Sequence, residues 1–101
     1  MARRSLPDAV LVARHFDDNG RLIALPVKRE RRRLVLEHIA RQIPPVTDLD
    51  EFTINNLLRQ FTEDVASVRR QLVDEGIVAR PQPGRYLRPA GWSGADQPRP
   101  A

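Results

Sequence analysis

Apolar residues recur at helical spacing in three segments of the chain, and the first of these segments lies between two proline signals. Pro26 suits a first helical turn, whereas Pro44-Pro45 prevents a helix from continuing. Between them the apolar positions share one helical face: Val35, Leu36, Ile39, Ala40 and Ile43. This stripe predicts a helix over residues 26–43 with one buried side.

The second and third helices are expected to follow each other almost without a connection. Asp48 or Asp50 provides the cap of the second helix. The third begins at Thr62 and ends at Gly76, a residue type that readily adopts the left-handed conformation after a helix. The residues expected to face inward are Ile54, Leu57, Leu58 and Phe61 in the second helix and Val65, Val68 and Leu72 in the third.

Shorter elements are expected before the helical region. Residues 7–16 fit either a short strand or a short helix, because their apolar positions match both spacings. Residues 17–20 read Asp-Asp-Asn-Gly, which is a strong turn signal. The apolar residues 22–25 then predict a short strand that ends at Pro26.

A hairpin after the third helix completes the expected architecture. Ile77-Val78 and Tyr86-Leu87 are expected to pair across residues 81–84. The fold class is therefore mainly α with a small β part. It is winged-helix-like, with a three-helix core that contains a helix-turn-helix and a C-terminal β-hairpin wing. We expect this domain to cover residues 7–89, between an N-terminal tail (1–6) and a flexible C-terminal tail (90–101).

The composition favours a soluble binding domain and excludes several kinds of chemistry. Hydrophobic residues make up 41% of the 101 residues, and no apolar run is long enough to cross a bilayer or to form the core of a signal peptide. The absence of cysteine excludes disulfides and thiolate zinc sites, and makes a cytoplasmic location the expectation. His15 and His38 have no partner at ligand spacing, and no nucleophile has an evident activating base. We therefore expect no enzyme, no metal site and no cofactor.

Charge is distributed unevenly along the chain. Lys and Arg number 17 against 13 Asp and Glu, for a net charge of +4, and Lys28 is the only lysine. Both ends of the chain are basic, whereas residues 36–64 are acidic. Because arginine grips phosphate through a planar fork, a basic face indicates an anionic partner, with DNA the usual one. A soluble protein that uses arginine in place of lysine would have the same composition.

Three groups of residues are the candidates for nucleic-acid binding. The first opens the first helix, where the helix start already carries positive charge: Lys28, Arg29, Arg31, Arg32 and Arg33. The second faces outward on the third helix: Ser67, Arg70 and Gln71. The third flanks the wing: Arg85 and Arg88, beside Arg80.

Each group also has a purely structural interpretation. A run of charges is usually the solvated face of a helix, and charged edge strands avoid pairing with other chains. Glu63 and Asp64 open the third helix, where they would repel DNA phosphates. The alternative function is therefore a protein–protein interaction or dimerisation module of a regulator. Its partner would be a second copy or a regulator protein, and no membrane is involved.

Five strings in a fixed order resemble one bacterial family. They are FDDNGRL at 16–22, LPVKR at 25–29, VLEHIA at 35–40, NNLLRQF at 55–61 and VRRQLVDEG at 68–76. Over about residues 10–88 the chain resembles the bacterial domain-of-unknown-function family numbered 2087. The resemblance implies a winged-helix-like fold and a regulatory context, since members occur alone or fused behind an ArsR-type repressor domain. The resulting hypothesis is a bacterial transcriptional regulator that binds DNA.

Overall fold

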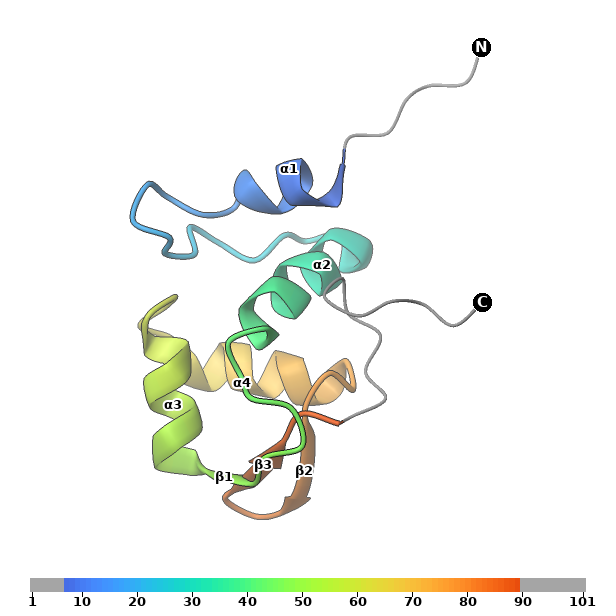
Figure 1. Ribbon diagram of the computed structural model, residues 1–101. Coiled ribbons are helices and arrows are strands. Elements are labelled where there is room, and N and C mark those ends of the chain that lie inside the picture. The colour runs from blue at the N-terminus through green and yellow to red at the C-terminus, as the bar shows by residue number, and fades with distance from the viewer. Residues whose placement is uncertain (1–6, 90–101) are drawn as a thin grey trace.

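The computed structural model describes residues 7–89, which form four helices and a small antiparallel sheet (Figure 1). The elements in chain order are α1 (Asp8–Ala13), α2 (Arg29–Ala40), β1 (Leu49–Asp50), α3 (Glu51–Arg59), α4 (Val65–Asp74), β2 (Ala79–Gln82) and β3 (Arg85–Leu87). The prediction of a mainly α, winged-helix-like fold is confirmed. The two predicted tails, 1–6 and 90–101, lie outside the described residues.

Helices α2, α3 and α4 enclose one core, as their apolar stripes predicted. Leu36, Ile54 and Leu72, one from each helix, are completely buried and belong to the same cluster. Leu57 is partly buried and packs against this cluster. Because α4 buries one stripe in this core, the position of its solvent-exposed face is fixed by the buried one.

The sheet has the strand order β1-β3-β2 and closes the open side of the helical core. Leu49 lies opposite Tyr86, and Gln82 lies opposite Arg85, with Gly84 at φ +77° in the turn between β2 and β3. The pairing shifts register between Ala79 and Gln82, where Pro81 has no N–H to donate. The two-residue strand β1 was not predicted, because so short a segment shows no alternation.

The predicted hairpin is correct in kind, but its first strand was placed too early. Ile77 and Val78 lie before β2, and both backbone N–H groups donate to the Leu72 carbonyl, at 3.0 and 3.2 Å. Gly76, at φ +74°, turns the chain out of α4 into this conformation, as predicted. Ile77 and Val78 are apolar because they are buried in the helical core, and not because they pair in the wing.

The predicted helix bounds were too wide. Helix α2 begins only at Arg29, since Lys28 is extended, and it ends at Ala40. Helix α4 begins at Val65 and not at Thr62, because Asp64 is its cap and accepts a hydrogen bond from the Ser67 N–H at 3.3 Å. Of the two possible caps of α3, Asp50 is the one used, accepting from the Thr53 N–H at 2.8 Å.

The N-terminal segment is helical and packs on the outside of α2. Helix α1 lies on the side of α2 that faces away from the sheet (Figure 1). The predicted strand at 22–25 does not form, and only a single bridge joins Phe16 and Leu22. The Leu22 N–H donates instead to the Phe61 carbonyl, at 2.7 Å, so this segment runs along the core without a partner strand.

Candidate nucleic-acid interface

Helix α4 presents the predicted reading residues on its solvent side. Val65, Val68 and Leu72 are buried, which turns Arg70 to the centre of the outward face. Arg70 is exposed, and Ser67 and Gln71 are partly exposed beside it. Within residues 7–89, no hydrogen bond or ion pair engages the side chain of Arg70 or Gln71. The fold does not use these two side chains.

A groove of about 240 Å³ lies between α4, the start of α3 and the wing. Arg69, Arg70 and Arg80 line it together with the carboxylates of Glu51 and Asp74. It is therefore a mixed-charge groove with a surplus of arginine.

Three side-chain contacts fix the shape of this groove. The guanidinium of Arg69 lies 5.5 Å from the centre of the Tyr86 ring and donates to the Asn55 side chain. The Tyr86 hydroxyl donates in turn to Glu51, at 3.3 Å. Arg69 is thus positioned by α3 and β3, while Arg70 and Arg80 remain exposed. Arg80 was expected beside the wing, and Arg69 precedes Arg70 on α4; the fold brings Arg80 into the same groove as both.

The basic segment at the start of α2 is engaged inside the protein. The Glu75 side chain is only 7% exposed, and its carboxylate accepts from Arg29 at 3.1 and 3.2 Å. Arg33 donates to the same carboxylate at 3.3 Å and to the Glu75 backbone carbonyl at 2.8 Å. The hydrogen bond from Arg29 is the main reason that the pKa of Glu75 lies below its ordinary value. These contacts join the start of α2 to the end of α4.

Arg32 is also held within the fold, whereas Lys28 and Arg31 are not. Arg32 donates to the Val27 carbonyl at 2.8 Å and lies 3.9 Å from Glu75. In the part of the chain that the structure describes, neither Lys28 nor Arg31 forms an ion pair, and both are exposed. In the predicted anion site at 28–33, Lys28 and Arg31 are therefore the two cations that are exposed and form no ion pair within residues 7–89.

The two wing arginines of the predicted set differ sharply. Arg85 lies on β3 and pairs with Asp48 at 2.9 Å, a contact that raises the pKa of Arg85. Arg88 is only 4% exposed and donates to the carbonyls of Ile43 and Ala40, at 2.9 and 3.4 Å. Ala40 is the last residue of α2 and Ile43 lies in the turn after it, so Arg88 ties the chain after β3 to the end of this helix. The expectation of an Arg88 lying along the wing surface is not met.

No metal centre is present among residues 7–89, since no three His, Asp or Glu side chains are grouped to hold an ion. Within the same range, no helix has the length and apolar character needed to cross a membrane. His15 and His38 do not share a site with the candidate contacts on α4. His38 packs instead between the rings of Phe16 and Phe61, with ring centres 4.9 and 6.3 Å away.

A three-helix core with a helix-turn-helix, closed by a β1-β3-β2 sheet, defines a winged-helix-like domain. The model of the bacterial family described as "Uncharacterized protein conserved in bacteria (DUF2087)" matches residues 21–88, and the chain belongs to this family. No curated protein and no solved structure matches the chain. The matched region begins after α1, so it contains the whole winged-helix core but not the N-terminal helix.

Proposed function

We propose that this protein binds double-stranded DNA through α4 and its wing, and that it takes part in transcriptional regulation in the bacterial cytoplasm as a binding protein and not as an enzyme. The observation that carries the proposal is the position of Arg70, which is exposed and unengaged at the centre of the outward face of α4. In winged-helix proteins this helix is the one that enters the major groove.

Each exposed side chain around the groove has a distinct role in this proposal. Arg70 and Gln71 suit base edges, since arginine pairs with guanine and glutamine with adenine. Arg80, exposed on β2, suits the phosphate backbone beside the groove. Glu63 and Asp64 stand at the start of α4 and repel phosphates there, so they lower the affinity for DNA of any sequence.

Fluorescence anisotropy with a labelled duplex of random sequence, titrated between about 50 and 200 mM salt, tests the proposal. We expect binding that weakens with salt, and a loss of affinity in Arg70→Ala and Arg80→Ala. Arg14→Ala is the matched control, because Arg14 is an exposed arginine at the end of α1, remote from α4. Absence of binding at the lowest salt, or equal losses in all three variants, contradicts the proposal.

A second candidate function is docking of a protein partner at the same groove. The observation that favours it is Phe52, which is 74% exposed on the first turn of α3, next to the groove residue Glu51. A large exposed aromatic side chain is typical of the centre of a protein interface. Sedimentation of the wild type and of Phe52→Ser separates the two candidates. Self-association that Phe52→Ser abolishes, in a protein that does not retain DNA, supports a homodimer instead.

A further inference from the structure

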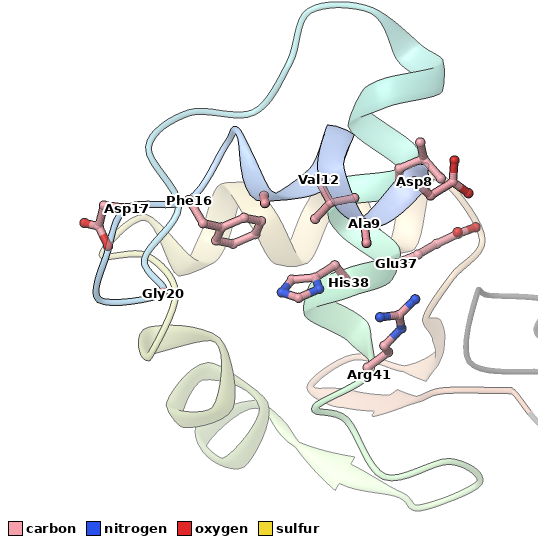
Figure 2. Close-up of a pocket in the computed structure, with 11 residues that line it drawn as sticks. Asp8, Ala9, Val12, Phe16, Asp17, Gly20, Glu37, His38 and Arg41 are labelled. Carbon is pink, nitrogen blue, oxygen red and sulfur yellow. The ribbon is translucent and has the colours of Figure 1, made fainter. Parts of the chain in front are cut away.

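A cavity of about 480 Å³ lies between α1 and α2, apart from the α4 groove (Figure 2). From the first helix and the turn after it, the lining residues are Asp8, Ala9, Val12, Ala13 and Phe16. From α2 and its cap, they are Leu34, Glu37, His38 and Arg41. The volume falls in the range of roughly 300–1,000 Å³ that is usual for small-molecule pockets.

The cavity exists because two facing helical stripes do not fill the space between them. Positions 34, 37, 38 and 41 form one face of α2, and positions 9, 12 and 13 form the facing side of α1. On α1 this side carries two alanines, and Val12 is the only buried residue of the helix. Ala9 and Ala13 are exposed, so the space is a pocket that opens to solvent, and their small side chains leave room that larger ones would close.

One end of the cavity is apolar and aromatic. The Phe16 ring lies 4.9 Å from the His38 ring, and Val12 and Leu34 contribute aliphatic walls. Burial and the neighbouring Arg41 lower the pKa of His38, so its imidazole is neutral near pH 7. Asp17, beyond Phe16, is already engaged, because its side chain accepts from the backbone N–H groups of Asn19 and Arg21.

The other end carries charges of both signs. Figure 2 shows Asp8, Glu37 and Arg41 on the same side of the cavity, with Arg41 extending toward Glu37. Glu37 pairs with Arg33, at 3.1 Å. Within residues 7–89, no ion pair engages Asp8 or Arg41. One carboxylate and one guanidinium are thus available to a ligand at this end.

We infer that the cavity binds a small zwitterion with an apolar body, namely an α-amino acid with an aliphatic or aromatic side chain. Arg41 pairs with the ligand carboxylate, Asp8 with its ammonium group, and Val12, Leu34 and Phe16 cover its side chain. A simple organic anion meets repulsion from Asp8, and a simple amine meets repulsion from Arg41. A ligand with both charges avoids both penalties.

This inference does not rest on DNA binding. The cavity uses α1, which lies outside the region matched by the family, and α1 packs on the side of α2 away from the sheet (Figure 1). A failure of the DNA titration leaves the cavity unaffected, and a failure of ligand binding leaves the α4 groove unaffected.

The experiment is a chemical-shift titration of the ¹⁵N-labelled full chain with L-leucine and L-phenylalanine, up to about 10 mM. The matched probes are 3-phenylpropionate, which lacks the ammonium group, and 2-phenylethylamine, which lacks the carboxylate. We expect saturable shifts of amides in α1 and α2 with at least one amino acid. We also expect about tenfold weaker binding of both analogues, which corresponds to one lost ion pair at about 1.4 kcal/mol.

Three variants assign the contacts. Arg41→Gln should weaken the amino acid about tenfold and tighten 2-phenylethylamine, because it removes the repulsion between two cations. Asp8→Asn should likewise tighten 3-phenylpropionate, because it removes the repulsion between two anions. Ala13→Leu should fill the cavity and abolish all binding while the helical circular dichroism is retained. No shift with either amino acid, analogues that bind as tightly as the amino acids, or unchanged binding in Ala13→Leu overturns the inference.

Discussion

The burial of Arg88 makes a sharp prediction, because sequence alone places this residue among the exposed wing arginines. Its guanidinium donates to the Ile43 carbonyl at 2.9 Å and to the Ala40 carbonyl at 3.4 Å. Arg88→Met keeps an unbranched apolar side chain of similar reach but removes the donors. The carbonyls of Ala40 and Ile43 then lose a charged partner in a buried position.

The expected cost follows from these two contacts. A hydrogen bond that involves a charged group contributes about 1.5–3 kcal/mol, and the longer contact at 3.4 Å adds less than the shorter one. We therefore expect Arg88→Met to lower the free energy of unfolding by about 2–4 kcal/mol. Small domains have only about 5–15 kcal/mol in total, so this is a large fraction.

Urea unfolding followed by far-ultraviolet circular dichroism measures this change. Arg85→Met is the matched control, because Arg85 lies on β3, just before Arg88, and forms an exposed pair with Asp48 that solvent screens. The control should unfold at nearly the wild-type urea concentration. If Arg88→Met is as stable as wild type and instead loses DNA affinity, Arg88 faces the phosphates and the assignment to α2 is wrong.

Three further predictions concern the buried face and the C-terminal end of α4. Leu72→Ala should cost about 2–5 kcal/mol in urea unfolding, because Leu72 is completely buried. Gly76→Ala should cost about 1–2 kcal/mol, since Gly76 has φ +74°; an unchanged midpoint would argue against this turn. Glu75→Gln should cost about 1–2 kcal/mol near neutral pH. The hydrogen bond from Arg29 is the main reason that the pKa of Glu75 is lowered in the folded state. The stabilisation that Glu75 provides is therefore fully present above its unfolded-state pKa of about 4.3, and it is lost as the pH falls through the lower folded-state pKa. The urea midpoint of Glu75→Gln should therefore fall less on acidification than that of wild type.

The sequence was informative wherever a structural cause is local. A stripe at 3.6-residue spacing needs no knowledge of distant residues, so the three core helices were predicted from their apolar faces. An aspartate cap at Asp48 or Asp50 and the turn at Gly76 follow from single residue types, and the structure selects Asp50. The errors arose where a short apolar run fits either a strand or a loop segment that packs on the core. Ile77 and Val78 are buried in the core, and Leu22 and Leu25 pack against it, although short apolar runs also predict strands.

The candidate interface was predictable only in part, for the same reason. The outward position of Arg70 follows from the period of its own helix. The engagement of Arg29 and Arg33 by Glu75 joins residues 46 and 42 positions apart, and the contact of Arg88 with Ile43 spans 45. Nothing in a linear charge run reveals such partners. The α1–α2 cavity was missed as well, because it depends on two alanines that face α2 only after folding.

The number of arginines that are bound within the fold determines how steeply the DNA affinity of this protein should depend on salt. Each phosphate contact contributes about −0.9 to the slope of log affinity against log salt. If Arg69, Arg70 and Arg80 all meet phosphates and no other cation does, the slope is about −3, and contacts by Lys28 and Arg31 extend it to about −5. A steeper slope requires Arg29, Arg32 and Arg33 to leave Glu75 and bind DNA instead. In that case Glu75→Gln, which releases these arginines in advance, would tighten binding while it weakens the fold. A shallow slope with no such gain means that the basic segment of α2 serves the fold, and that the α4 groove alone carries recognition.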